Sequence, residues 1–311
     1  MFSRYWIKYH LKKSKAVLNC YKRISDSFNA TLVRISPLLF VKLRFRTKRH
    51  KWPNLKNPQS FDEKLLWLNL YWRHPLKTKC GEKYTMRAYV KEHGLEHLLP
   101  QLLGLYENSN EIDFDSLPQR FVLKCTRGSG FNIVCKEKSD LDVKDTKCKL
   151  DAWMKVDTSK CGELHYAAMK RRIICESFLD DSSSDLPSDY KVFCFNGKAH
   201  CTMACTERRL NMRAKYDFYD LSWKNKLPYS RTSLLANRNI PKPEAYEEII
   251  AAAEILSKPF PFVRMDFYSI NGKAVIGEMT FTPEACIDVN LTDLAQRILG
   301  ELINLPEKRI K

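Results

Sequence analysis

The chain has 311 residues, 44% of them hydrophobic, which is enough to bury a core as one large or two modest domains. Its eleven cysteines are odd in number and form no Cys-x-x-Cys pair, so a disulfide framework is not indicated and a reducing, cytosolic compartment is expected. The net charge of +17 lies mostly at one end, because residues 1–51 carry fourteen Lys and Arg against the single acid Asp26.

Residues 1–52 form a basic segment that mixes aromatic and aliphatic side chains with the lysines. No apolar stretch in it approaches the roughly 20 residues that span a bilayer, and no secretory cleavage site follows an uncharged core. We expect a basic amphipathic helical segment. It either lies on an anionic membrane surface, through residues 1–51, or packs on the body as an ordinary helix. Nucleic acid is not expected as a partner, because no zinc-finger or RNA-binding motif accompanies the charge.

The remaining residues, 53–311, are predicted to form the catalytic body. Ser60 and Glu63 make a capping box, which predicts a helix that runs to about Trp72. A second helix is predicted over Glu82–His93, where Gly94 ends it. Further helices are predicted at 142–155, 243–257 and 290–303.

Short strands alternate with these helices. They are predicted at Phe121–Cys125, Phe131–Cys135, Arg172–Cys175, Lys191–Phe195, Lys198–Ala204, Phe262–Tyr268 and Ala274–Thr280. Two connections are Asn-Gly, at 196–197 and 271–272, which are strong hairpin signals. Antiparallel hairpins between helices indicate an α+β fold rather than a parallel sheet.

The tip between the first two strands is rich in glycine. Gly128, Ser129 and Gly130 can bring backbone N–H groups onto phosphate oxygens, and Lys124 on the preceding strand adds a positive charge. Most glycine tips merely turn the chain, so this feature alone is weak evidence for a phosphate site.

The last hairpin places two carboxylates, Asp266 and Glu278, in an apolar region. They either share a divalent cation or pair with basic neighbours such as Arg264. The register decides between these readings. A two-residue turn would put Asp266 opposite Gly277 and the acids on opposite faces, whereas a three-residue loop would put both acids on one face. Shared metal binding is therefore predicted to require the longer loop.

The order of these segments resembles the TupA-like branch of the ATP-grasp superfamily over about residues 54–285. The resemblance rests on linked motifs: Asn57-Pro58 with Phe61–Lys64, Phe121–Lys124 with its Gly-Ser-Gly tip, Asp189–Gly197, Phe218–Asp220, and Phe262–Arg264 leading to Glu278–Pro283. The chain departs from the family pattern at Pro283–Cys286, where a glycine-richer stretch is expected.

The resemblance implies an ATP-grasp fold. Two antiparallel-sheet subdomains, a smaller lid at about 82–175 and a C-terminal subdomain at about 176–300, would hold ATP between them. It also implies site roles. Lys83 and Lys124 would contact phosphates under a lid of Gly128, Ser129 and Gly130, Glu176 and the backbone near Phe178 would meet adenine, and Asp189 would meet the ribose. Asp266 and Glu278 would hold Mg²⁺, while Lys191, Arg208, Arg209 and Arg264 would face the γ-phosphate or the acid substrate.

The implied activity is a carboxylate–amine ligase that forms an acyl phosphate and releases ADP. This branch is associated with cell-surface polysaccharides and teichuronopeptide. A saccharide or lipid-linked saccharide carboxylate of the uronic-acid type would thus be joined to an amino acid or amine, at the inner membrane face. Two alternatives remain: a glycosyltransferase-type enzyme of the same pathway, and a non-catalytic protein that binds polyanions or membranes.

Overall fold

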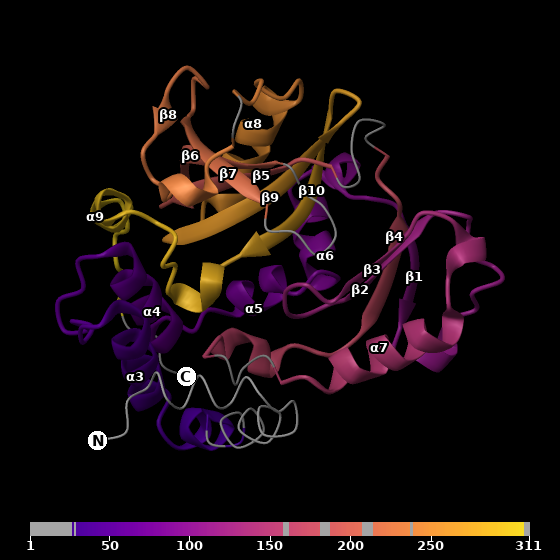
Figure 1. Cartoon of the computed structure of the whole chain (residues 1–311), viewed down its shortest axis with the longest axis horizontal. Helices are drawn as coiled ribbons and strands as arrows, with labels where there is room; N and C mark the ends of the chain where they lie inside the picture. Colours follow the sequence, from indigo (N-terminus) through magenta and orange to yellow (C-terminus); the bar gives the residue numbers. More distant parts are fainter. Residues whose placement is uncertain are drawn as a thin grey trace.

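Two antiparallel sheets dominate the computed structural model, with helices packed on their outer faces and between them (Figure 1). The structure describes residues 27, 29–157, 162–180, 187–206, 214–236 and 239–307. Helices and antiparallel sheets occur together in one chain, which confirms the predicted α+β class.

The larger sheet has the strand order β10-β9-β5-β6-β7-β8. Its strands are β5 (Asp189–Phe195), β6 (Lys198–Thr206), β7 (Lys215–Asp220), β8 (Lys226–Leu227), β9 (Phe262–Ile270) and β10 (Lys273–Thr280). Helix α8 (Tyr246–Ser257) covers one face, where Ile249 and Leu256 are fully buried. The sequence did not predict β7 or β8.

The smaller sheet has the order β1-β4-β2-β3. Its strands are β1 (Leu102–Tyr106), β2 (Phe121–Cys125), β3 (Asn132–Cys135) and β4 (Ile173–Ser177). Helix α7 (Val143–Lys155) packs Leu150 against the face that carries Phe121, Leu123 and Cys175. Because strand side chains alternate between faces, Lys124 and Glu176 lie on the other face, away from α7.

The remaining helices are α3 (Pro37–Arg49), α4 (Phe61–Tyr71), α5 (Pro75–Gly81), α6 (Thr85–Glu92) and α9 (Asp293–Glu301). Ser60 and Glu63 form the predicted capping box at the start of α4. The helix predicted over Glu82–His93 is wrong at its start, because Lys83 lies in the turn between α5 and α6. The Glu82 carboxylate accepts a hydrogen bond from the Thr85 N–H at 2.7 Å there, so α6 begins two residues after Lys83.

Helix α3 belongs to the basic segment and packs on the body. Ser36 caps it, Pro37 occupies its first turn, and Phe40, Val41 and Phe45 are buried in the core. Arg49 joins α3 to α4 and to the C-terminal part of the chain, because it pairs with Asp62 at 2.6 Å and donates to the Asp288 carbonyl. Residues 1–26, which carry much of the predicted basic segment, lie outside the described residues.

Candidate functional site

Asp266 and Glu278 lie directly opposite each other in the β9–β10 ladder. The turn at Asn271-Gly272 has two residues, with Ile270 paired to Lys273, so the expectation that a shared face needs a three-residue loop is wrong. The register instead shifts between Ile276 and Glu278, where Gly277 forms a β-bulge. One extra residue reverses the parity of the strand beyond it, so the two carboxylates share a face.

Two cations hold Asp266 on the large sheet. Arg264 donates two hydrogen bonds of 2.7 Å to its two oxygens, and Lys191 on the adjacent strand β5 makes an ion pair of 2.5 Å. Lys191 also pairs with Asp189 at 2.5 Å, while the second oxygen of Asp189 is buried without a hydrogen-bond partner among the described residues. Asp266 thus pairs with Arg264, which is the basic neighbour that the sequence analysis named as the alternative to a shared cation.

Lys83 connects the two sheets. Its backbone N–H donates to the Thr126 carbonyl, its ammonium donates to the Gly128 carbonyl at 2.9 Å, and the same ammonium lies 3.3 Å from Glu278. The glycine-rich tip of the small sheet is therefore joined by one side chain to the carboxylate pair of the large sheet.

Lys124 and Glu176 form a second ion pair, of 2.7 Å, on the free face of the small sheet. Arg87 from α6 contacts the other oxygen of Glu176 at 3.0 Å and is held by the Pro100 carbonyl. Burial by itself would lower the pKa of Lys124, but the charge and hydrogen bond of Glu176, together with Tyr268 and Glu278, outweigh it, so this pKa is raised. The two sheets face each other here, because Lys83 contacts Gly128 of the small sheet and Glu278 of the large sheet.

Electrostatics in this cluster favour the ionised forms of Glu278, Lys191 and Arg264. Burial opposes the charge of Glu278, yet Lys83, Lys191 and Arg264 together lower the pKa of its carboxyl to about 2. Burial would also lower the pKa values of Lys191 and Arg264, but Asp266 and neighbouring acids raise both. Burial raises the pKa of Asp266, and Arg264 and Lys191 oppose that shift.

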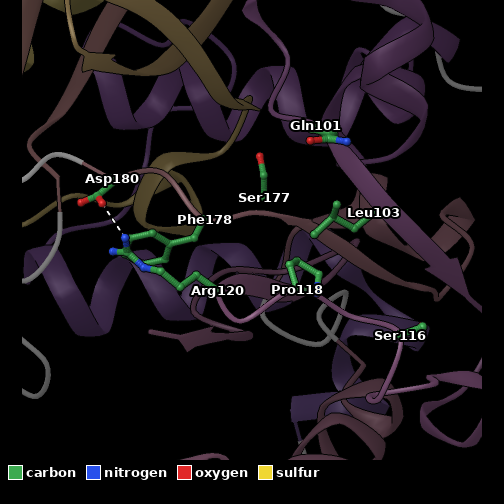
Figure 2. Close-up of a pocket in the computed structure, with 8 residues that line it drawn as sticks. All are labelled: Gln101, Leu103, Ser116, Pro118, Arg120, Ser177, Phe178 and Asp180. Carbon is green, nitrogen blue, oxygen red and sulfur yellow. Dashed lines mark hydrogen bonds and ion pairs between the residues drawn. The ribbon is translucent and has the colours of Figure 1, made fainter. Parts of the chain in front are cut away.

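The structure brings together most of the predicted site residues, but not all of them. The tip residue Gly128 adjoins Lys83, whereas Ser129 and Gly130 are exposed. The Phe178 ring instead stacks on Arg120, whose guanidinium carbon lies 4.1 Å from the ring centroid, beside an Arg120–Asp180 ion pair. Figure 2 shows them in a separate surface pocket with Ser177, which points to the opposite face of β4 from Glu176. Arg208 and Arg209 lie outside the described residues.

Three polar residues of this region carried no predicted role. Arg87 binds Glu176, Thr280 donates to Glu278 at 3.1 Å and accepts from Arg264 at 3.3 Å, and Glu82 binds Arg172 at 3.1 Å. In the helix predicted over Glu82–His93, Lys83 and Arg87 would lie one turn apart, and this spacing was the only sequence signal for any of them.

Carboxylate oxygens are the ligands that Mg²⁺ prefers, and Asp266 and Glu278 present them from paired positions. Within the described ranges, no group of three or more His, Cys, Asp or Glu side chains forms a complete metal site. A magnesium ion here would therefore take its other ligands from phosphate and water, as nucleotide-bound Mg²⁺ does.

The sequence matches the family model of the TupA-like ATP-grasp proteins over residues 63–304. The chain belongs to the TupA-like ATP-grasp family. The match covers both sheets and every described residue of the cluster. Comparison with curated proteins gave no match.

Solved structures with related folds are distant from this TupA-like chain. A D-alanine–D-alanine ligase from Bacillus anthracis, complexed with ATP, shares 14% identity over 65% of this chain and 55% of its own, with a TM-score of 0.38. An N5-carboxyaminoimidazole ribonucleotide synthetase in complex with ADP shares 17% identity over 75% of this chain and 54% of its own, with a TM-score of 0.44. A D-alanine–D-alanine ligase from Helicobacter pylori shares 13% identity over 81% of this chain and 68% of its own, with a TM-score of 0.43. The chain thus spans little more than half the length of the first two, and residue roles are not transferred from them.

Proposed function

We propose that this protein is an ATP- and Mg²⁺-dependent carboxylate–amine ligase that releases ADP. The observation that carries the proposal is the position of Lys83, which touches both the glycine-rich tip at Gly128 and the carboxylate Glu278. A triphosphate placed at Lys83 would meet backbone N–H donors from one sheet and carboxylates for its cation from the other.

In this proposal the part of each group comes from the family resemblance, and the contacts of Lys83 and the pairing of Asp266 with Glu278 support it. Lys83 and Lys124 bind phosphate oxygens beneath a lid formed by Gly128, Ser129 and Gly130. Glu176, positioned by Arg87, and the backbone near Phe178 receive the adenine, and Asp189 receives the ribose. The small sheet, within about 82–175, closes over the larger subdomain at about 176–300.

Asp266 and Glu278 would hold the magnesium ion, which when bound neutralises charge on the transferred phosphoryl group. Arg264 and Lys191 both pair with Asp266 and would bind the γ-phosphate or the acid substrate. Arg208 and Arg209 are assigned the same task from the family pattern alone. Phosphoryl transfer needs positioning and cations where charge develops, which is what this set supplies.

The substrate class follows from the family. We infer a uronic-acid-type carboxylate on a saccharide or lipid-linked saccharide, joined through a C–N bond to an amino acid or amine during cell-surface polysaccharide synthesis. The glycosyltransferase alternative is less well supported, because the paired acids stand beside a glycine-rich phosphate tip. A purely polyanion-binding protein would not need the buried carboxylate of Asp266 and the half-buried carboxylate of Glu278 on the sheet that faces this tip.

A two-step assay tests the ligase. Phosphate release from ATP is measured with uronic-acid sugars against a panel of amino acids and amines, and hydroxylamine is used in parallel to capture any acyl phosphate as a hydroxamate. Hydroxamate formation that requires ATP, Mg²⁺ and a carboxylic acid supports the proposal. Nucleotide binding with no acid-dependent phosphate release or hydroxamate would contradict it.

A second proposal concerns location: α3 rests on an anionic membrane at the cytoplasmic face. Exposed apolar side chains repeat at helical spacing, with Ile35 77%, Leu38 37%, Leu39 44% and Leu43 38% exposed. Arg34, Arg46 and Lys51 are exposed near this row. An apolar row flanked by cations suits the interface of an anionic bilayer. No helix in the described part of the chain has the length and apolarity to cross a membrane.

A further inference from the structure

The turn between α5 and α6 carries three residues, Glu82, Lys83 and Tyr84, and each of them contacts the small sheet or the segment that leads into it. Glu82 pairs with Arg172 at 3.1 Å, and the guanidinium carbon of Arg172 lies 4.6 Å from the centroid of the Tyr84 ring. The backbone N–H of Lys83 donates to the Thr126 carbonyl at 2.9 Å. Glu82, Tyr84 and Arg172 have no role in the proposed ligase site.

Arg172 holds this turn by two routes. It stands directly before β4, and its carbonyl accepts from the Thr126 N–H at 2.9 Å, which continues the β2–β4 ladder by one residue. Thr126 in turn accepts from Lys83, so the first route runs through the backbone. The second route runs through the Arg172 guanidinium to Glu82, the residue next to Lys83. These contacts close a ring of four residues from three segments of the chain, which we call the Lys83 clamp: Glu82, Lys83, Thr126 and Arg172.

The ion pair in the Lys83 clamp is buried but incomplete. Glu82 is 2% exposed, and the Arg172 side chain is 12% exposed. The contact joins Glu82 Oε2 to Arg172 Nη2, while Glu82 Oε1 and Arg172 Nε are buried without a hydrogen-bond partner among the described residues. A buried ion pair with unsatisfied atoms adds little to stability, and apolar residues of similar volume often serve a fold as well. Stability alone therefore does not account for this pair.

Lys83 needs a fixed position because its ammonium serves both sheets. It donates to the Gly128 carbonyl at 2.9 Å and lies 3.3 Å from Glu278. Lys83 precedes the first residue of α6, so the regular hydrogen bonds of a helix do not fix its backbone. Its side chain is a flexible four-carbon stem, and a misplacement of about 1 Å in a catalytic group can cost about a hundredfold in rate. The backbone of the turn must therefore be held by its neighbours.

We propose that Glu82 and Arg172 are positioning residues that set the Lys83 ammonium at the phosphates of the bound nucleotide. The Tyr84 ring supports the Arg172 guanidinium, and Glu82 also accepts from the Thr85 N–H at 2.7 Å, which ties the start of α6 to the same point. Arg172 acts through Lys83 and does not itself bind the nucleotide. This inference rests on the proposed ligase function and deepens it by naming the groups that place its phosphate-binding lysine.

Three variants remove the ion pair at similar volume: Arg172→Met, Glu82→Gln and the two together. The amide oxygen of Glu82→Gln can still accept from the Thr85 N–H. The double variant leaves neither charge buried alone, so the test does not depend on the fold tolerating one unpaired charge. Arg171→Met is the matched control, because Arg171 is the adjacent arginine, is exposed and donates to the Met154 carbonyl at 3.1 Å. Urea unfolding checks that each variant folds.

Calorimetric titrations compare a non-hydrolysable ATP analogue with Mg²⁺ against adenosine, which lacks the phosphates. We expect the three variants to bind the analogue on the order of tenfold to a hundredfold more weakly and to bind adenosine like the parent, because only the phosphate contact of Lys83 is lost. Arg171→Met should bind both like the parent. In a Lys83→Met background, Arg172→Met should cause no further loss, since its effect passes through Lys83.

The placing of the Lys83 ammonium can also be followed without nucleotide. Reductive methylation with formaldehyde, mapped by mass spectrometry, measures how fast each lysine reacts. The Lys83 side chain is 16% exposed and its ammonium is engaged with Gly128 and Glu278, so we expect slow labelling in the parent. Labelling of Lys83 should be several-fold faster in Arg172→Met and unchanged in Arg171→Met.

Parent-like affinity for the ATP analogue in the three variants overturns the inference. An equal loss for the analogue and for adenosine also overturns it, because that result indicates general damage to the site. A full loss from Arg172→Met in the Lys83→Met background would mean that Arg172 binds the nucleotide directly, against the proposal. If the parent binds no analogue, the proposed function fails, and the labelling decides the Lys83 clamp by itself, with unchanged rates rejecting it.

Discussion

Glu278 faces Asp266 across the last hairpin because β10 contains one residue more than its partner strand at Gly277. Without that bulge, the two-residue turn would put the carboxylates on opposite faces of the sheet. An added Cβ at Gly277 would lie 3.1 Å from the Tyr268 ring and 3.3 Å from the Asp266 carbonyl oxygen. The bulge, and with it the shared face, depends on a small residue at this point.

The bulge makes Gly277→Val a test of the metal site. We expect the larger side chain to displace Glu278 and to weaken Mg²⁺-dependent ATP binding by about tenfold, while the fold persists. Calorimetry with and without Mg²⁺ measures the effect. Gly272→Asn is the control, because the positive-φ turn position accepts asparagine. Equal Mg²⁺ dependence in parent and Gly277→Val would exclude the paired-carboxylate site.

Lys124→Ala and Asp266→Asn should each abolish ATP turnover with a true substrate and leave the circular dichroism spectrum unchanged. Lys124 supplies a phosphate contact, and Asp266 orients Arg264 and Lys191 besides holding the cation. Lys79→Ala, on the surface of α5, should turn over ATP normally. Parent-like hydrolysis by either site variant would show that the assignment is wrong.

Glu278 gives a prediction about pH. Its pKa is lowered from 4.5 to about 2 in the folded protein. The carboxylate therefore adds stability that is complete above its unfolded pKa and is lost as the pH falls from about 4.5 to about 2. Urea unfolding at a series of pH values should show a shallower loss of stability in Glu278→Gln than in the parent over this window. Parallel curves would mean that Lys83, Lys191 and Arg264 do not stabilise the ionised form.

Membrane association is tested on the exposed row of α3. Deleting residues 1–50 is unsuitable, because it would also remove Phe40, Val41 and Phe45 from the core. Serine at Leu38, Leu39 and Leu43 together should reduce binding to phosphatidylserine vesicles by about tenfold or more and spare ATP affinity. Leu294→Ser, at 39% exposure on α9, is the matched control. Vesicle sedimentation that is unchanged by the triple substitution would reject the anchor.

The strained turn after β10 predicts that a glycine substitution there increases the stability of the fold, whereas glycine substitutions usually lower it. Ala285 has φ 50° and ψ 49°, so Ala285→Gly should raise the free energy of unfolding by about 1 kcal/mol. Ala251→Gly, at an exposed position inside α8, should lower it by about 1 kcal/mol. Chemical denaturation compares the two variants. A loss of stability in Ala285→Gly would show that the turn is not strained.

The sequence by itself determined the elements whose causes are local. The Ser60–Glu63 capping box and the two Asn-Gly turns act within a few residues, and each forms as predicted. The ordered motifs from Phe61 to Pro283 also identified the ATP-grasp family correctly. β1 escaped prediction, because it pairs with β4, which lies far away along the chain. β7 was not predicted either, although its partners β6 and β8 are its neighbours along the chain.

Only the tertiary structure decided which charges meet. The register at Gly277, the Arg87–Glu176 contact and the Lys83–Glu278 ion pair all depend on segments that packing of the two sheets brings together. A charged side chain reaches a few ångströms in space, whatever the separation along the chain. Its partner is therefore set by the fold, and residue type and spacing could name the candidates but not join them.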